Sequence, residues 1–282
     1  MSVIFTVIFL ILYGSHIFSQ TVNPGNNHIN QHSDIFYTGK EDSLQSLDVY
    51  WKPGAKNARV LVFVHGGGWL SEDKKLYREM ASYLADNGVT VVVVNYRLSP
   101  AVKFPSHAED VAAAVYWTYM FINKYNGDKQ NIYLMGHSAG AHLITLILCD
   151  KKYLEKYKMA PKDIAGAVTL NGVFEIKTQE GGATKKFLGM VFGDDETVWQ
   201  EASCKNHINQ KSKNSVPQFL ISWSKKDDPL IVNENKNIIA EFKKAEMDFR
   251  TFLFDGNNHY AFKNDLKNNE SAFFEKLMQF ME

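Results

Sequence analysis

Three residue types that together cleave esters and amides occur along this chain in a chemically meaningful order. Ser138 lies between two glycines in Gly136-His137-Ser138-Ala139-Gly140, and it is followed by the pair Asp227-Asp228 and then by His259. A serine hydroxyl becomes a nucleophile when a histidine accepts its proton and a carboxylate orients that histidine. The order serine, aspartate, histidine is one of the chain orders in which such triads occur. These residues therefore predict acyl transfer through a serine.

The serine pentapeptide stands where a strand is expected to give way to a helix. Residues 131–135 form a short apolar run, and residues 141–148 form a longer one that suits a buried helix. Strand, tight turn and helix is the setting that exposes the serine of a G-x-S-x-G motif. Outside that setting, a helix N-cap serine would be the simpler interpretation. Here the N–H of Ala139 is expected to point toward the serine hydroxyl.

The candidate base and acid each follow an apolar strand. His259 comes after the strand expected at residues 249–254, and of the nine histidines it alone follows a late strand in a loop of glycine and asparagine. Asp227 and Asp228 come after the strand expected at residues 217–223. Each of these residues could instead belong to a solvated loop, a turn or a helix cap. The residues by themselves leave both aspartates open as the acid.

A run of three glycines supplies candidate oxyanion donors. His65-Gly66-Gly67-Gly68 directly follows the buried strand expected at residues 59–64. Consecutive glycines let backbone N–H groups face a substrate without obstruction by side chains. A phosphate-binding loop is the alternative, but the Lys-Ser/Thr pair that such a loop requires does not follow.

Composition narrows the classes of protein that remain. The chain has 282 residues, 45% of them hydrophobic, which suits one globular domain with a sizeable core. Lys plus Arg and Asp plus Glu both number 31, so a nucleic-acid partner is not expected. Two cysteines make no disulfide framework; a single bridge stays open, and Cys149 is expected to be a buried free thiol. No motif predicts a metal or a cofactor.

The elements that must position these residues alternate between strand and helix. Continuous β-branched runs such as residues 89–95 are typical of parallel strands buried on both faces. The alternation predicts an α/β fold with a mostly parallel sheet, preceded by an antiparallel hairpin. Strands are expected at 34–38, 44–51, 59–64, 89–95, 131–135, 164–170, 217–223 and 249–254, and helices at 73–87, 106–125, 141–148, 231–245 and 269–281.

Residues 171–207 break this alternation and predict a small cap insertion over the site, with helical pieces at 187–192 and 196–203. The insertion contributes four large aromatic residues that we expect near the mouth of the site. A short aromatic cap predicts a small apolar pocket, suited to an aromatic leaving group and a short acyl chain. The four residues are Phe174, Phe187, Phe192 and Trp199.

The N-terminus predicts export. Val3–Tyr13 is a continuous apolar run of signal-peptide length, too short to span a membrane. We assign residues 1–19 to a signal peptide, 20–33 to a flexible polar leader and 34–282 to the catalytic domain. The protein is then secreted or periplasmic, without stable membrane association after cleavage. The segment carries no Lys or Arg before the apolar run, and the alternative is an uncleaved N-terminal membrane anchor.

Several short motifs occur in the order of a known group of enzymes. On these motifs the chain resembles the α/β-hydrolase superfamily, in its esterase/lipase and kynurenine formamidase-like branch, from about residue 47 to the C-terminus. The serine motif is closer to the formamidase-like and bacterial acetyl/feruloyl-esterase-like members than to hormone-sensitive-lipase relatives, which carry Gly-Asp-Ser-Ala-Gly. The motifs are His65-Gly66-Gly67-Gly68-Trp69, Asn95-Tyr96-Arg97-Leu98-Ser99-Pro100, Phe104-Pro105, Glu109-Asp110 and Gly136-His137-Ser138-Ala139-Gly140-Ala141-His142-Leu143.

The resemblance implies the α/β-hydrolase fold, with helices on both faces of the sheet. It also implies that Ser138 is the nucleophile and His259 the base, and that Gly67, Gly68 and Ala139 form the oxyanion hole. Members of the family often have glycine three residues before the acid. Counting back three residues from Asp227 gives the small Ser224, whereas the same count from Asp228 gives Lys225, so Asp227 is preferred. Lys225 and Lys226 are expected to face solvent.

Other polar residues receive structural roles. The resemblance implies that Arg97, Glu109 and Asp110 form an ion network under the site. His142 lies one helical turn after Ser138, where we expect a packed side chain and not a catalyst.

The predicted activity is hydrolysis of small carboxylic esters through an acyl-enzyme. An arylformamidase that cleaves N-formylkynurenine is the alternative, ranked second because export separates the protein from that intracellular substrate. An alternative of another class is a non-catalytic binding protein with the hydrolase fold. Such relatives usually lose a triad member, whereas this chain keeps all three.

Overall fold

The computed structural model describes residues 28–177, 183–255 and 259–282. The predicted signal peptide and most of the predicted leader lie outside the described residues. The end of the leader is a correction: residues 30–33 belong to strand β1 (Asn30–Phe36), which starts earlier than expected. β1 is an edge strand, paired on one side only, and such a strand tolerates a polar sequence that hides its hydrophobic periodicity. Within the described residues, no helix is both long and apolar enough to cross a membrane.

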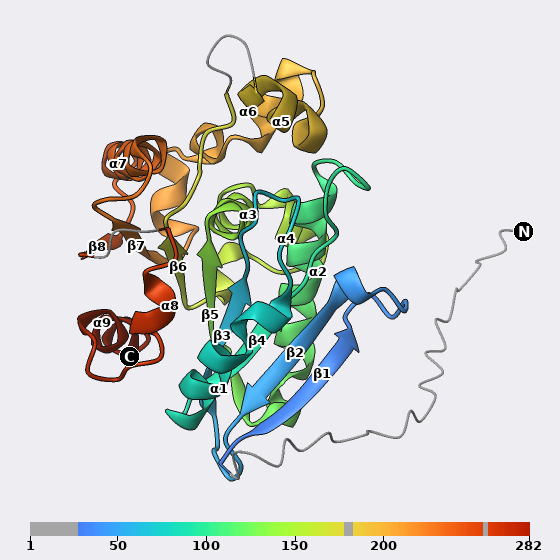
Figure 1. Ribbon diagram of the computed structural model, residues 1–282, viewed down its shortest axis with the longest axis vertical. Helices are drawn as coiled ribbons and strands as arrows, with labels where there is room; N and C mark the ends of the chain where they lie inside the picture. The colour runs from blue at the N-terminus through green and yellow to red at the C-terminus, as the bar shows by residue number, and fades with distance from the viewer. Residues whose placement is uncertain (1–27, 178–182, 256–258) are drawn as a thin grey trace, which may run out of the picture.

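Within the described residues, eight strands form one sheet, in the order β1-β2-β4-β3-β5-β6-β7-β8 (Figure 1). β1 and β2 pair antiparallel, as the predicted hairpin requires, and β2 pairs antiparallel with β4. All other neighbours are parallel, so the mostly parallel sheet is confirmed. The strands that follow β1 are β2 (Ser46–Trp51), β3 (Ala58–Val64), β4 (Thr90–Val94), β5 (Gly127–His137), β6 (Gly166–Leu170), β7 (Gln218–Ser224) and β8 (Phe249–Phe254).

Helices cover both faces of the sheet (Figure 1). Successive side chains of a strand point to opposite faces, and β3 uses both for burial. Val62 packs in one core with α2, α3 and α7, whereas Phe63 packs in a second core with α1 and α9. This is why β3 is apolar at every position from Val60 to Val64. The helices are α1 (Arg78–Asp86), α2 (Ser106–Phe121), α3 (Ala139–Cys149), α4 (Lys152–Glu155), α5 (Ala183–Phe192), α6 (Glu196–Ala202), α7 (Pro229–Lys244), α8 (Phe262–Asp265) and α9 (Ala272–Phe280).

The parallel strands bring the predicted site residues to one edge of the sheet. β3, β5, β6, β7 and β8 run in the same direction, so their carboxyl ends meet there. The segments that follow these five ends hold the glycine run, the candidate nucleophile, a buried asparagine, the candidate acid and the candidate base. In strand order they are Gly66–Gly68, Ser138, Asn171, Asp227 and His259.

The predicted cap insertion lies between β6 and β7. Its helices α5 and α6 fall where helical pieces were predicted, although α5 begins earlier, at Ala183. Both lie beyond the carboxyl ends of the strands, above α3 (Figure 1). After α6 comes a short 3₁₀ turn that contains Cys204. Cys204 and Cys149 are both free thiols, so the single bridge left open by the sequence does not form; Cys204 is buried and Cys149 is half-buried.

Candidate active site

Ser138 occupies the sharp turn between β5 and α3. Its backbone has φ 51° and ψ −114°, a conformation that non-glycine residues rarely adopt. The two flanking glycines make the turn possible, because a Cβ on Gly136 would lie 2.4 Å from the carbonyl oxygen of Gly140, and one on Gly140 would lie 2.1 Å from that of Val64. The Ser138 N–H donates to the Leu170 carbonyl at 2.9 Å, which holds the strained residue in place.

His259 and Asp227, 32 residues apart, form a hydrogen-bonded pair. The Nδ1 atom of His259 lies 2.7 Å from Oδ2 of Asp227. The Asp227 side chain is only 5% exposed, whereas that of His259 is 26% exposed, so the carboxylate is buried and the imidazole reaches the surface of the site. An imidazole whose Nδ1–H is held by a carboxylate keeps Nε2 available to accept a proton. The geometry is that of a base with its orienting acid.

Asp228 has a different role. Its Oδ1 accepts the Leu230 N–H at 2.8 Å, which caps the N-terminus of α7, and the side chain is exposed. Its own N–H donates to Oδ1 of Asp227 at 2.7 Å. The structure therefore pairs the histidine with Asp227 and uses the second aspartate as a helix cap. Lys225 and Lys226 are both exposed, as expected.

Two residues that sequence reasoning missed anchor the histidine. Asn171 is buried, and its Nδ2 group donates to Oδ2 of Asp227 at 2.7 Å and to the His259 carbonyl at 3.0 Å. His137 Nε2 lies 3.0 Å from the same carbonyl, and its ring lies 4.6 Å from the His259 ring. Burial, reinforced by the nearby His259, lowers the pKa of His137 far enough that its ring stays neutral. Because His137 precedes Ser138, these contacts tie the histidine loop to the serine turn.

The signals for these anchors were weak. His137 is the variable position of the G-x-S-x-G motif, which gives it no role. Asn171 is the first polar residue after β6, and a polar residue at the carboxyl end of a parallel strand is the signal that could have found it.

The loop after the glycine run is joined to the histidine loop by Glu72. One carboxylate oxygen of Glu72 accepts the Tyr260 hydroxyl at 2.7 Å, and the other accepts the Tyr77 hydroxyl at 2.6 Å. Burial is the larger cause and the contact with Glu72 the smaller one of a rise in the pKa of Tyr260 to about 12. This phenol therefore remains a donor at neutral pH. Since Tyr260 follows His259, this bridge links the two loops that supply the candidate base and the candidate oxyanion donors. Sequence reasoning gave no role to Glu72.

The glycine run makes a tight turn beside Ser138. Gly67 has φ 80°, and a Cβ there would lie 2.2 Å from the Ser71 carbonyl oxygen, so only glycine fits. The Gly67 carbonyl accepts the N–H groups of Leu70 and Ser71, each at 3.1 Å. Of the three predicted oxyanion donors, Gly68 and Ala139 line a cavity together with Ser138, whereas Gly67 forms the turn that precedes Gly68.

This cavity, hereafter the Ser138 cavity, has a volume of about 310 Å³. Its apolar wall comes from the end of the glycine run, from the segment after β6, from α5 and from the start of α7. Three charged residues, Glu175, Lys177 and Glu234, also line it. The apolar wall consists of Trp69, Val173, Ile176, Phe187, Leu188, Leu230 and Ile231.

The predicted aromatic mouth is wrong in most of its members. Of the four predicted residues, Phe187 lines the Ser138 cavity. Phe192 and Trp199 are 3% and 4% exposed, and the Phe192 ring packs 5.0 Å from Trp69, so it anchors the insertion to the body of the protein. Phe174 lines a neighbouring cavity instead. Large rings gain most when they are fully buried, which favours this anchoring over exposure at a mouth.

Of the polar residues that were given structural roles, all but Glu109 lie where they were expected. His142 is fully buried, its Nε2 lies 2.8 Å from the Ala202 carbonyl, and burial lowers its pKa to about 4, so it is a neutral packed side chain. Arg97 and Asp110 form a bidentate ion pair with both distances 2.7 Å. Glu109 is not part of that pair: it is half-exposed and lies 3.6 Å from Lys156. Adjacent helical residues point about 100° apart, which separates Glu109 from Asp110.

No group of three or more His, Cys, Asp or Glu side chains is placed to hold a metal ion in the part of the chain that the structure describes.

Comparison with known proteins gives a consistent result. The BD-FAE family model matches residues 47–241. The chain is 26% identical over 245 residues to the probable carboxylic ester hydrolase LipM of Mycobacterium tuberculosis, an alignment that covers 79% of this chain and 56% of LipM. It is also 26% identical over 211 residues to a kynurenine formamidase of Meyerozyma guilliermondii, covering 73% of this chain and 78% of the enzyme. The chain thus spans little more than half the length of LipM.

Among solved structures, esterase B from Lactobacillus rhamnosis superposes with a TM-score of 0.76 at 22% identity, covering 90% of this chain and 85% of the esterase. At that identity the likeness concerns the fold, which is the one that the sequence motifs predicted.

Proposed function

The chain belongs to the BD-FAE family, and on that premise we propose that it is a serine hydrolase of small carboxylic esters. The resemblance to α/β-hydrolase esterases and formamidases is thereby confirmed as a family relationship. The observation that carries the proposal is the His259–Asp227 pair at 2.7 Å, anchored to the strained turn that presents Ser138. The resulting arrangement is a nucleophile, a base and an acid, and it needs no metal.

In the proposed mechanism, the ester enters the Ser138 cavity and the serine hydroxyl attacks its carbonyl carbon. His259 accepts the hydroxyl proton on Nε2, and the buried Asp227 stabilises the imidazolium that forms. The carbonyl oxygen becomes an oxyanion, which the backbone N–H groups of the Gly67–Gly68 turn and of Ala139 stabilise. Donors that are already fixed in position contribute most because nothing has to reorganise during the reaction.

The tetrahedral intermediate then expels the alcohol, which takes the proton from His259. The acyl group stays on the Ser138 oxygen until water, deprotonated by the same histidine, attacks it and releases the acid. His137 and Asn171 act as positioning residues, because they hold the backbone of His259 during both proton transfers.

The size of the Ser138 cavity limits the substrates. About 310 Å³ lies at the lower end of the range for small-molecule pockets. Among acetyl, octanoyl and palmitoyl esters of one phenol, acetyl is expected to exceed palmitoyl in kcat/KM by at least about 100-fold, because a palmitoyl chain is too large for a cavity of this volume. Release of the phenol measures the rates. A preference for palmitoyl would make the protein a lipase and contradict the small-pocket proposal.

A formamidase is the second candidate, favoured by the relative from Meyerozyma guilliermondii, which matches over 78% of its own length. The same triad serves both reactions, since a formyl group is the smallest acyl group. N-formylkynurenine therefore belongs in the same comparison as the esters. A kcat/KM for it above that of the acetyl ester would reverse the ranking of the two activities.

We further propose that the protein is exported, from the apolar run Val3–Tyr13 and the small residue Ser19. Expression with the native N-terminus is expected to yield exported protein that begins near Gln20, as N-terminal sequencing would establish. Exported or membrane-bound material that still begins with Met1 would favour an uncleaved anchor instead.

A further inference from the structure

Three charged residues interrupt the apolar wall of the Ser138 cavity, and the two carboxylates among them have different partners. Glu175, Lys177 and Glu234 all line it. Glu175 is paired twice: Lys177 Nζ lies 2.5 Å from its carboxylate, and Lys205 Nζ contacts its other oxygen. Although burial acts to raise the pKa of Glu175, these two lysines hold it below the usual value. Glu175 is therefore an ionised group whose charge is already compensated.

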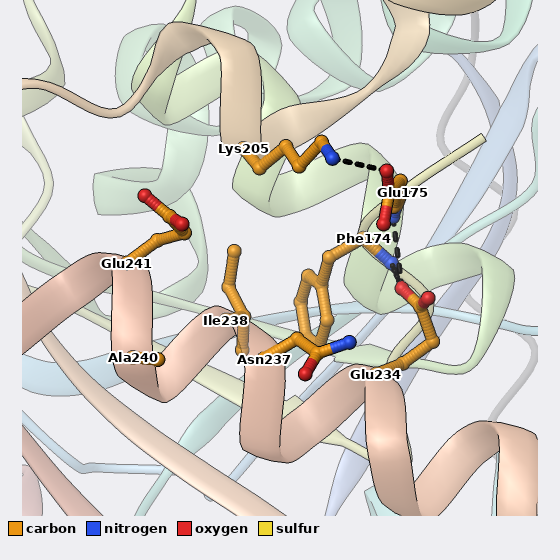
Figure 2. A pocket seen from close by; sticks show the side chains of 8 residues that line it. All are labelled: Phe174, Glu175, Lys205, Glu234, Asn237, Ile238, Ala240 and Glu241. Carbon is orange, nitrogen blue, oxygen red and sulfur yellow. Dashed lines mark hydrogen bonds and ion pairs between the residues drawn. The ribbon is translucent and has the colours of Figure 1, made fainter. Parts of the chain in front are cut away.

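Glu234 is held by backbone groups and not by a lysine in contact with it. Its Oε2 accepts the backbone N–H groups of Phe174 and Glu175, each at 2.8 Å, as Figure 2 shows. Within the described residues, no Lys, Arg or His side chain forms an ion pair with it, and its Oε1 accepts no hydrogen bond. Burial raises the pKa of Glu234 above its usual value, although its two backbone hydrogen bonds and the charge of Lys177 act to lower it.

Because two backbone N–H groups donate to Oε2, Oε1 is the carboxylate oxygen left for a ligand. Two hydrogen bonds to the segment after β6 anchor the carboxylate through Oε2, and Glu234 lines two cavities. One is the Ser138 cavity, and the other is a neighbouring cavity of about 210 Å³ between α7 and Lys205 (Figure 2). Glu234 is half-buried, and a ligand that supplies a donor to its unoccupied oxygen gains binding energy.

We propose that Glu234 is a specificity-determining residue that accepts a hydrogen bond from a hydroxyl or ammonium group on the substrate's leaving group. The preferred substrates are then short-chain esters of aryl alcohols that carry such a donor on the ring. The apolar wall holds the ring, and Oε1 of Glu234 selects its polar substituent. The inference rests on the proposed function, because the cavity receives a leaving group only if Ser138 is the nucleophile.

Three acetate esters of nearly equal size test the inference: 4-ethylphenyl, 4-(hydroxymethyl)phenyl and 4-(ammoniomethyl)phenyl acetate. They differ only in the ring substituent. The ethyl group donates no hydrogen bond, the hydroxymethyl group is a neutral donor, and the ammoniomethyl group is a charged donor. The wild-type protein is expected to hydrolyse each of the two donor esters with a kcat/KM about tenfold or more above that of the ethyl ester. Comparing the rates of the two donor esters shows whether Glu234 prefers an ammonium or a hydroxyl group.

The variant Glu234→Gln removes the acceptor with little change in shape. The amide oxygen can still accept the N–H groups of Phe174 and Glu175, so the melting temperature is expected to stay near that of the wild type. The amide nitrogen replaces Oε1 and is a donor, so the preference for the ammonium ester over the ethyl ester should fall about tenfold or more. The readout is the ratio of the two rates, so a change that affects both esters equally does not count toward it.

Glu241→Gln is the matched control. Glu241 lies seven residues along the same helix and lines only the neighbouring cavity (Figure 2). This variant should keep the wild-type ratios within about twofold.

The outcomes separate this inference from the proposed function. If the wild type hydrolyses none of the three acetates, the ester hydrolase proposal fails. If it hydrolyses the ethyl ester as well as the donor esters, and Glu234→Gln leaves the ratios unchanged, only the role of Glu234 is overturned. An equal loss of preference in Glu241→Gln would also overturn it, because the effect would then come from the general negative charge of α7.

Discussion

Replacing Ser138 by alanine is expected to lower kcat on an activated acetyl ester by on the order of 10⁴ or more, with the fold intact. The substitution removes the attacking oxygen and nothing else, because no described hydrogen bond of the fold uses the Ser138 hydroxyl, and its backbone contacts to Leu170 and His142 do not involve the side chain. A fluorophosphonate probe, which bonds covalently to an activated serine, should label the wild type and leave this variant unlabelled. Hydrolysis and labelling together measure the effect.

The control for this experiment is Ser215→Ala. Ser215 is exposed, and its hydroxyl donates only to the Lys211 carbonyl, so activity and labelling should both be retained. His259→Ala should fall to the level of the Ser138 variant, because members of a triad act as a unit. More than about a tenth of wild-type activity in Ser138→Ala would contradict the mechanism, and a protein that is never labelled would be a non-catalytic member of the fold.

Replacing Asp227 by asparagine is expected to lower kcat by roughly 10³ to 10⁴. Both carboxylate oxygens are acceptors: Oδ1 receives the Asp228 N–H at 2.7 Å, and Oδ2 receives Asn171 at 2.7 Å and pairs with His259 at 2.7 Å. An amide nitrogen in either place faces a donor, so the imidazole loses its orientation or the loop loses a bond. The negative charge that stabilises the imidazolium is lost in both cases. Steady-state kinetics on the acetyl ester measures the effect.

The adjacent residue provides the matched comparison. Asp228→Asn should cost less than about tenfold in kcat, because asparagine caps a helix nearly as well as aspartate and the Asp228 side chain does not touch the imidazole. Both variants remove one charge from the same loop, so a general electrostatic effect would reduce them alike. The reverse ranking would transfer the acid role to Asp228 and leave the rest of the mechanism in place.

The order of elements and the location of the site could be predicted from the sequence. Residues 60–64 and 91–94 are apolar at every position because β3 and β4 bury both faces, and that burial leaves a continuous signal in the chain. Ser138, Asp227 and His259 each follow a strand of the parallel part of the sheet, and parallel strands end at one edge. The glycines of the serine turn were also informative, because the close approach of Gly140 to Val64 permits no side chain.

Only the tertiary structure decided which groups touch. Asp227 and Asp228 have the same chemistry in the same loop, and they differ because one points to His259 and the other caps α7. The anchors His137 and Asn171 and the free oxygen of Glu234 depend on contacts between loops that are far apart in the chain.

The predicted aromatic cap failed for the same reason. Phe192 reads in the sequence as one more large apolar residue near the site, and whether it lines a cavity or fills a core depends on how the insertion settles on α3 and Trp69. A buried strand is apolar in its own sequence, so the sequence was enough to predict the sheet and the edge at which its parallel strands end. A contact between two side chains depends on how two distant segments lie relative to each other, and folding alone sets that arrangement.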